Sequence, residues 1–217
     1  MTLLSIKDLS VSIYGKPIIR NVSFKLGAGE ILALTGESGS GKSISALALM
    51  GLLPYGSKKG GIINFEGKDL NKITETNFCK LRGKKISMVF QEPMTALNPV
   101  LSIGKQIAET LVQHKACAPN ELKNLVRKTM DRVGLQNIKP SRFPHELSGG
   151  QRQRVVIAMA VCLQPKVLIA DEPTTALDVT TQSKILALLR DFAKKDGISI
   201  ILICLLYTSP SPRDRVQ

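Results

Sequence analysis

The sequence contains little of what builds metal-bound, disulfide-linked or membrane-spanning proteins. Its four cysteines include no C-x-x-C pair, which argues against a zinc site and a disulfide framework, so we expect buried free thiols. There are only two histidines, His114 and His145. No apolar run approaches the roughly 20 residues of a transmembrane helix. The chain also opens directly into Lys7 and Asp8 rather than into a signal peptide, so we expect a protein that stays in the cytosol.

Acidic residues are scarce compared with basic ones. There are 17 Asp and Glu residues against 30 Lys and Arg residues, which gives a formal net charge of +13. This charge suits an ATP-binding surface, an anionic membrane or nucleic acid, and it does not choose among them. The hydrophobic content of 43% is sufficient for a real core, and the length of 217 residues allows one large domain or two small ones.

The most informative stretch is a glycine-rich segment between the apolar run 31–34 and the helix-like run 44–53. A G-x-x-x-x-G-K-S pattern between a strand and a helix is typical of a loop that binds phosphate. Its glycines permit a tight turn, and the positive end of the helix attracts an anion. We expect Lys42 to reach the β- and γ-phosphates and the Ser43 hydroxyl to hold Mg²⁺. The predicted nucleotide-binding residues of this loop are Gly36, Glu37, Ser38, Gly39, Ser40, Gly41, Lys42 and Ser43.

Two carboxylates follow a second apolar run, 167–170. Asp171 and Glu172 stand at the carboxyl end of this expected strand, which is the edge where ligands bind in open α/β sheets. We expect Asp171 to hold the Mg²⁺ shell, and Glu172 to polarise the water that attacks the γ-phosphorus.

A second glycine-rich segment, Leu147-Ser148-Gly149-Gly150-Gln151, precedes another expected helix. Ser148 can serve as the N-cap of that helix, and the two glycines free the backbone for a second phosphate contact. One phosphate loop does not need a second cradle, so we predict that residues 148–151 contact a nucleotide held by another copy. A head-to-tail pair with ATP between the two copies follows. A simple helix cap remains the alternative.

The remaining pattern alternates strands with helices, which predicts an α/β fold with a mainly parallel core sheet. An antiparallel hairpin around Gly15-Lys16-Pro17 is expected at the N-terminus, and a helical subdomain at about 92–158. Apolar residues at helical spacing, for example Ile103, Ile107 and Leu111, support the helical insertion. The expected strands are 3–13, 18–26, 31–34, 62–65, 86–90, 167–170 and 198–203, and the expected helices outside the insertion are 44–53, 74–81, 150–163 and 180–195.

Taken in order, these motifs resemble the ATP-binding subunit of an ABC transporter over residues 3–203. The Walker A loop is followed by Gln91, the signature 147–151, the Walker B acids and Ala176-Leu177-Asp178, the D-loop. The resemblance implies a P-loop NTPase fold with ATP and Mg²⁺ as cofactors. It also implies that Gln91 reaches Mg²⁺ and the attacking water, and that Asp178 belongs to the nucleotide site. On spacing alone Tyr14 could be an ordinary strand-end tyrosine, whereas the resemblance gives it the role of stacking on adenine.

Residues 90–99 and 143–154 are similar to the peptide/nickel importer subfamily. This likeness implies an ATPase that drives uptake of dipeptides, oligopeptides or nickel. The ATPase is then expected to be cytoplasmic and peripheral on the inner face of the cell membrane. The implied partners are a second ATPase subunit, identical or different, two membrane permease subunits contacted by the segment after Gln91, and indirectly an extracytoplasmic solute-binding protein. No nucleic-acid partner is expected, although a soluble ABC ATPase acting on nucleic acid or ribosomes is the alternative.

The chain departs from the family after Ile203, where Thr-His-Asp is replaced by Cys204-Leu205-Leu206. Neither histidine of the chain can take the γ-phosphate role of the missing one. Residues 204–217 resemble a translated sequencing adapter, with a divergent natural tail as the alternative. We therefore expect a nucleotide-binding domain at 1–203 that is incomplete at its C-terminus, binds ATP, hydrolyses it poorly and exposes apolar surface near Ile201.

Overall fold

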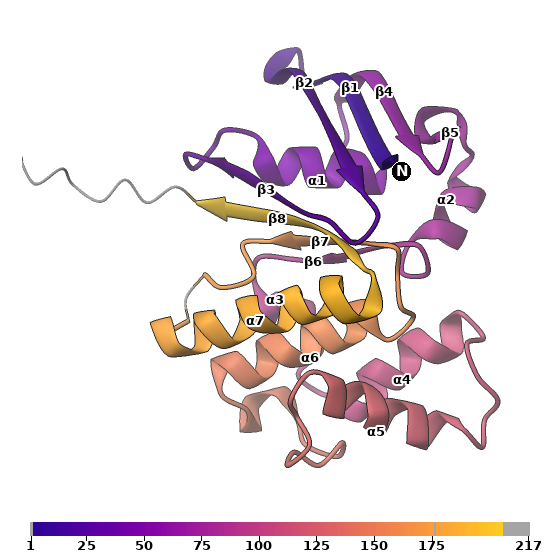
Figure 1. Cartoon of the computed structure of the whole chain (residues 1–217), viewed down its shortest axis with the longest axis vertical. Coiled ribbons are helices and arrows are strands. Elements are labelled where there is room, and N and C mark those ends of the chain that lie inside the picture. Colours follow the sequence, from indigo (N-terminus) through magenta and orange to yellow (C-terminus); the bar gives the residue numbers. More distant parts are fainter. Residues whose placement is uncertain (1, 176, 206–217) are drawn as a thin grey trace, which may run out of the picture.

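The computed structural model describes residues 2–175 and 177–205, and it contains two four-stranded sheets with helices around them (Figure 1). The strands are β1 (Thr2–Ile13), β2 (Lys16–Gly27), β3 (Ile31–Gly36), β4 (Ser57–Phe65), β5 (Lys68–Asp69), β6 (Ile86–Val89), β7 (Val167–Asp171) and β8 (Ser199–Leu205). One sheet, β2-β1-β4-β5, is antiparallel, and the other, β3-β8-β7-β6, is parallel. The prediction of a parallel core with an antiparallel N-terminal part is confirmed.

Helices separate and cover the two sheets. They are α1 (Lys42–Met50), α2 (Glu75–Leu81), α3 (Pro93–Ala96), α4 (Ile103–Gln113), α5 (Leu122–Arg132), α6 (Gly149–Val161) and α7 (Val179–Asp196), with short 3₁₀ turns η1 (Leu70–Lys72) and η2 (Pro144–Glu146). Helix α1 lies between the sheets, whereas α6 and α7 cover the other face of the parallel sheet (Figure 1). Among the residues described, no helix combines the length and apolarity needed to cross a membrane.

Strand β7 shows why the parallel sheet reads as a continuous apolar run. Val167 and Ile169 belong to the apolar cluster shared with α1 and the antiparallel sheet, and Leu168 and Ala170 to the cluster under α6 and α7. A strand covered on both faces has no position for a polar side chain. The apolar run therefore ends at Asp171, the last residue of β7, at the carboxyl end of the parallel strands.

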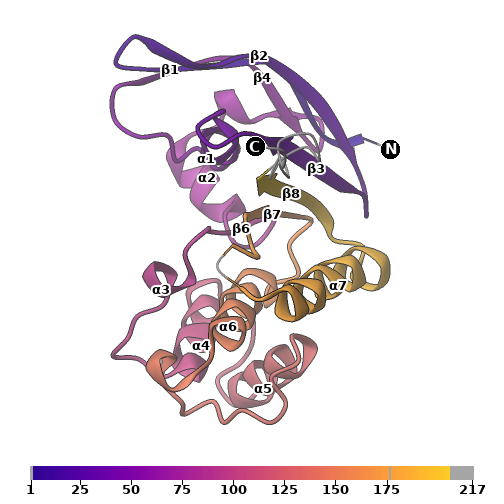
Figure 2. The ribbon, with the colours of Figure 1, turned by 90° about the vertical axis from the view of Figure 1, so that its left-hand side faces the viewer.

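The helical insertion forms a separate layer of the molecule. Helices α4 and α5 pack against α6, on the far side of the parallel sheet from β1 and β2 (Figure 2). The predicted apolar stripe of α4 is fully buried at Ile103, Ile107 and Leu111. These residues join the same apolar cluster as β7 and α7, so the helical layer is continuous with the core.

The N-terminal hairpin is tighter than expected. The turn consists of Tyr14 and Gly15 alone, with φ of 47° and 80°. Two consecutive positive φ values are typical of the two-residue turns that match strand twist. The expectation that Lys16 and Pro17 belong to the turn is therefore wrong, since both lie in β2. Strand β2 is at the edge of its sheet, where a missing proline N–H is tolerated.

Strand β4 is longer than expected because two glycines lie inside it rather than before it. Gly61 has a φ of 88°, and a Cβ there would lie 2.4 Å from the carbonyl oxygen of Asp8. The facing strand shifts register between Lys7 and Ser10 at this point. At the end of β4, Glu66 forms ion pairs with Lys85 and Lys166, at the starts of β6 and β7, and so links the two sheets.

Two expectations about exposure are wrong. Ile201 is fully buried, because β8 lies between β3 and β7 instead of at an edge. Only Cys162 of the four cysteines is buried, while Cys79 is exposed on α2. Of the proposed foreign segment 204–217, Cys204 and Leu205 pair with Thr35 and Gly36 of β3, and residues 206–217 lie outside those described.

Candidate nucleotide site

The phosphate loop joins β3 to α1 and has the conformation its glycines allow. Gly39 and Gly41 have φ of 80° and 88°, and Gly41 is the N-cap of α1. A Cβ on Gly41 would lie 3.0 Å from Ile19 Cγ1 and 3.2 Å from the Ile18 carbonyl oxygen, so the loop also packs closely on β2. Helix α1 begins at Lys42, two residues before the predicted start. Its first turn has no side-chain cap and no acidic residue, which leaves backbone N–H groups for an anion.

The side chain of Lys42 is held by its own loop. Its Nζ donates to the carbonyl oxygens of Gly36 and Glu37 at 2.9 and 2.7 Å, and lies 3.4 Å from Ser40 Oγ. These contacts place the ammonium inside the curve of the loop. A phosphate bound there meets a positive charge without a long movement of the lysine stem.

Asp171 lies at the end of β7 and is only 4% exposed. Its Oδ1 atom is buried and has no hydrogen-bond partner within the described part of the chain. Burial raises the pKa of Asp171, the neighbouring Glu172 charge adds to the rise, and hydrogen bonding by the Ser43 hydroxyl opposes it. A buried carboxylate oxygen without a donor, beside a hydroxyl, is a set of hard oxygen ligands that fits Mg²⁺.

Glu172 follows in a left-handed conformation, with φ of 46°. Its backbone N–H donates to the Ile203 carbonyl oxygen at 3.1 Å, which fixes the residue to β8. The carboxylate Oε2 accepts hydrogen bonds from Gln91 Nε2 at 2.8 Å and from Thr175 Oγ1 at 3.1 Å. The structure thus brings Gln91, from the loop after β6, to the residue predicted to activate water.

A cleft of about 200 Å³ is lined by Lys42, Ser43, Gln91 and Glu172. This is smaller than the roughly 300–1,000 Å³ of a typical small-molecule site, so it suits phosphate groups rather than a whole nucleotide. Tyr14 is 77% exposed, and its ring lies against Gly56. An aromatic face is therefore accessible at the turn that leads into β2, whose Ile18 lines the cleft.

The second glycine segment lies elsewhere. Ser148 Oγ accepts from the Gln151 N–H at 3.3 Å, and Gln151 Oε1 accepts from the Ser148 N–H at 2.9 Å, which is a capping box at the start of α6. The expected N-cap is confirmed. Within the described residues, none of 147–151 lines the phosphate cleft, so one chain does not bring the two glycine segments together.

The signature segment packs instead on the start of α7. A Cβ on Gly150 would lie 2.5 Å from Thr181 Cγ2, and one on Gly149 would lie 3.4 Å from Leu177 Cδ2. Asp178 is the N-cap of α7, with Oδ1 accepting from the Thr181 N–H at 2.9 Å. This hydrogen bond is the main reason that the pKa of Asp178 is lowered. Ala176 of the expected D-loop lies outside the described residues.

The sequence analysis missed two polar side chains in this region. One is Thr175, whose hydroxyl contacts Glu172. The other is Gln182, whose Nε2 donates to the carbonyl oxygens of Thr174 and Leu177 at 3.2 and 3.0 Å and so holds the loop before α7. A hydroxyl three residues after a predicted catalytic acid is a usable signal, since a single turn brings the two together.

Comparison with known proteins agrees with this geometry. A family model described as ABC transporter matches residues 19–175. The chain is 47% identical over 210 residues to the oligopeptide transport ATP-binding protein AppD of Bacillus subtilis, covering 93% of this chain and 64% of the relative. It is 50% identical over 209 residues to OppD of the same organism, covering 93% and 58%. The chain thus spans about three fifths of the length of these relatives.

Solved structures give the same fold. CbiO1 of Clostridium perfringens, described as part of the transporter complex cbiONQ, superimposes with a TM-score of 0.82 at 31% identity, covering 94% of this chain and 78% of that one. A dimeric post-hydrolysis state of the ATP-binding cassette MJ0796, bound to ADP and Pi, gives a TM-score of 0.80 at 28% identity, with coverage of 92% and 87%. The predicted fold of an ATP-binding cassette is confirmed.

Proposed function

The chain belongs to the ABC transporter family, and we propose that it binds and hydrolyses ATP to drive import of a di- or oligopeptide or a nickel-like solute through a membrane permease. The observation that carries the proposal is the convergence of Lys42, Gln91 and Glu172 on one small cleft. The names of the similar proteins AppD and OppD support peptides as the cargo and transport as the process. No comparable observation supports an action on nucleic acid or ribosomes.

In this proposal each residue in and around the cleft has a distinct task. The N–H groups of residues 36–43 and the Lys42 ammonium bind the phosphates, while Ser43, Asp171 and Gln91 hold Mg²⁺. Bound Mg²⁺ supplies charge neutralisation for the phosphate oxygens. Glu172 takes a proton from the water that attacks the γ-phosphorus, the bond to the β–γ bridging oxygen breaks, and ADP and phosphate leave. Tyr14 stacks on the adenine.

A second ATPase subunit completes the site. Residues 148–151 and Asp178 lie on the α6–α7 side, outside the phosphate cleft of their own chain. We infer that they face the nucleotide of the neighbouring subunit, an arrangement consistent with the dimer described for MJ0796 with ADP and Pi. Residues 92–158 then form a helical subdomain that can shift against the core when Gln91 responds to the nucleotide.

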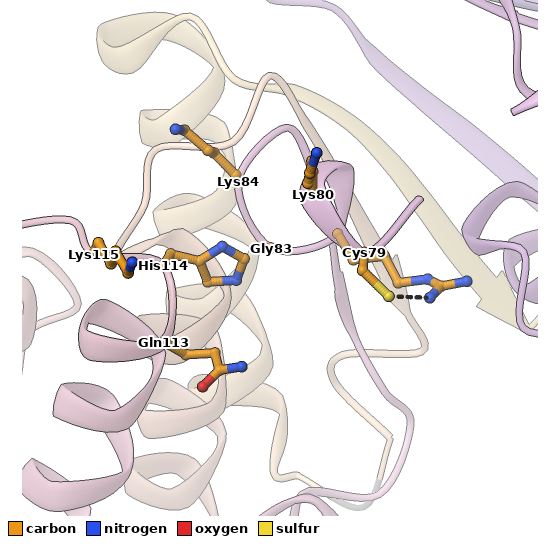
Figure 3. Close-up of a pocket in the computed structure, with 8 residues that line it drawn as sticks. Cys79, Lys80, Gly83, Lys84, Gln113, His114 and Lys115 are labelled. Carbon is orange, nitrogen blue, oxygen red and sulfur yellow. Dashed lines mark hydrogen bonds between the residues drawn. The ribbon is translucent and has the colours of Figure 1, made fainter. Parts of the chain in front are cut away.

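A basic cleft suits the permease contact. A hollow of about 760 Å³ lies between the α2–β6 connection and the end of α4, and Figure 3 shows Lys80 and Lys84 on one side of it and His114 and Lys115 on the other. The charge favours an acidic cytoplasmic segment of a permease subunit. Docking here would place the ATPase peripherally on the inner face of the membrane and would touch both the core and the helical layer.

Nucleotide chemistry is tested first. The purified chain should bind a fluorescent ATP analogue, and phosphate release from radiolabelled ATP should be slow but measurable. Glu172→Gln should abolish release while leaving binding intact, because it removes the proton acceptor and keeps the shape. A chain that releases phosphate equally well with Gln at this position would overturn the assigned mechanism.

Docking is tested by co-expressing the chain with a pair of peptide-transporter permease subunits and solubilising the complex in detergent. The charge reversals Lys84→Glu and Lys115→Glu should reduce co-purification, whereas Lys7→Glu, on an exposed position of β1, should not. Equal recovery of all three variants would exclude this cleft as the contact. ATP-dependent uptake of dipeptides by liposomes containing the complex would establish import, and its absence would contradict the transport proposal.

A further inference from the structure

We propose that Thr175 is a positioning residue for Glu172, and that its hydroxyl fixes which carboxylate oxygen is presented to the attacking water. This inference deepens the proposed hydrolysis of ATP and rests on it. Thr175 lies three residues after Glu172, in the loop between β7 and α7, and none of the sequence motifs assigns it a role.

The hydrogen bonds to Glu172 are unequally shared between its two oxygens. Thr175 Oγ1 lies 3.1 Å from Oε2, and Gln91 Nε2 donates to the same atom at 2.8 Å. Among the described residues, every hydrogen bond to this carboxylate ends on Oε2. The carboxylate therefore cannot rotate without breaking two hydrogen bonds, and Oε1 is the oxygen left to accept a proton from water.

The two donors differ in how firmly they are held. The Thr175 N–H donates to the Glu172 carbonyl oxygen at 3.1 Å, so threonine and glutamate belong to one closed turn. Gln182 holds the same loop through the carbonyl oxygen of Thr174. Gln91, by contrast, is an exposed residue from the loop after β6, and it is 81 positions away in sequence.

This difference gives the threonine a specific task. In the proposed mechanism the amide oxygen of Gln91 reaches Mg²⁺ and water, a movement that draws its Nε2 donor away from Oε2. The Thr175 hydroxyl then remains the hydrogen bond that keeps Glu172 in the same rotamer. A general base that is free to rotate spends less time in the reactive geometry, which lowers the rate of hydrolysis but not the affinity for ATP.

The test compares Thr175→Val, which keeps the shape and removes the hydroxyl, with Thr175→Ser, which keeps the hydroxyl. Thr110→Val is the control, because it removes a hydroxyl whose one hydrogen bond among the described residues is to the Gln106 carbonyl oxygen within α4. We expect Thr175→Val to lower kcat on the order of tenfold to a hundredfold with little change in KM. Thr175→Ser and Thr110→Val should remain close to the unmodified chain.

A second readout does not depend on turnover. The side-chain amide signals of Gln91 in a ¹⁵N–¹H NMR spectrum should shift in Thr175→Val, because its acceptor carboxylate becomes free to move, and stay in place in the other two variants. Loss of activity that Thr175→Ser fails to rescue, or unchanged Gln91 signals in Thr175→Val, overturns the proposal. If the unmodified chain releases no phosphate, the hydrolysis proposal fails separately, and the Gln91 signals alone decide the role of Thr175.

Discussion

Asp171→Asn should raise the stability of the chain without metal and reduce the stability that the chain gains from Mg²⁺ and ATP, and these two opposite effects make it a sharp test of the Mg²⁺ site. The wild-type carboxylate is 4% exposed, and its Oδ1 atom has no hydrogen-bond partner among the described residues. An unsatisfied buried polar atom costs about 1–3 kcal/mol, and more when it is charged. Asparagine removes the charge but keeps a buried polar atom, so it recovers only part of this cost and should raise the free energy of unfolding by about 1 kcal/mol in EDTA at pH 8.

The pH dependence follows from the direction of the pKa shift. Burial raises the pKa of Asp171 in the folded chain, so the folded state binds this proton more tightly than the unfolded state does. The destabilisation is absent below the unfolded pKa of about 3.9 and grows as the pH rises through the folded pKa. The difference between Asp171→Asn and wild type should thus be small near pH 4 and largest at pH 8.

Chemical denaturation at both pH values, with and without Mg²⁺ and ATP, measures these differences. With both ligands present, the wild-type chain should gain more stability than the variant, because the asparagine side chain is a weaker ligand for Mg²⁺. Glu109→Gln, an exposed carboxylate on α4, serves as the control and should change stability by less than about 0.5 kcal/mol. A less stable Asp171→Asn chain in EDTA at pH 8 would show that the buried carboxylate does not destabilise the metal-free fold.

Three further predictions address binding and stability. Lys42→Ala should weaken ATP binding about 10- to 150-fold, because it removes one charge-assisted hydrogen bond worth about 1.5–3 kcal/mol. In the same titration Lys7→Ala should bind ATP as the wild-type chain does. Equal affinities of the wild-type and Lys42→Ala chains would show that Lys42 does not bind the phosphates. Glu66→Gln should lower the unfolding free energy at pH 7 by roughly 1 kcal/mol or less, because its ion pairs are partly exposed. Those ion pairs lower the pKa of Glu66, so this contribution is lost as the pH falls through the folded pKa, and a pH-independent difference would contradict it. Gly61→Ala should cost about 3 kcal/mol or more, since its Cβ would clash with the backbone of β1, whereas Gly60→Ala, with nothing within 4 Å, should cost less than about 1 kcal/mol.

Patterns among residues close in sequence were sufficient to predict much of the fold and of the candidate site. The G-x-x-x-x-G-K-S segment, the apolar strand ending at Asp171 and the Ser148 cap are all defined by neighbours in sequence, and each lies where it was expected. The wrong predictions concern positions whose burial depends on segments that are distant in sequence. Apolar surface near Ile201 was expected to be exposed because further core strands and helices were expected to be missing, yet β8 pairs on both sides, and only the strand order in space shows this.

The same limit applies within the candidate site. Gln91 and Glu172 were identified separately, but their hydrogen bond depends on how the loop after β6 meets the end of β7. The expected strand 62–65 began after Gly60 and Gly61, and the register shift of β1 that accommodates Gly61 is a property of the facing strand. Neither the Gln91–Glu172 hydrogen bond nor the position of Gly61 inside a strand can be predicted from one segment alone, because each depends on the segment that packs against it.

In the proposed dimer two copies of the chain close on one nucleotide, with the phosphate loop of one and residues 148–151 of the other on either side of it. Sedimentation of the Glu172→Gln chain with saturating ATP and Mg²⁺ tests this arrangement. We predict a dimer that forms only with nucleotide and is lost when Gly149, on the signature side, is replaced by arginine. A chain that stays monomeric at saturation, or a dimer that forms equally well without ATP, would contradict the claim.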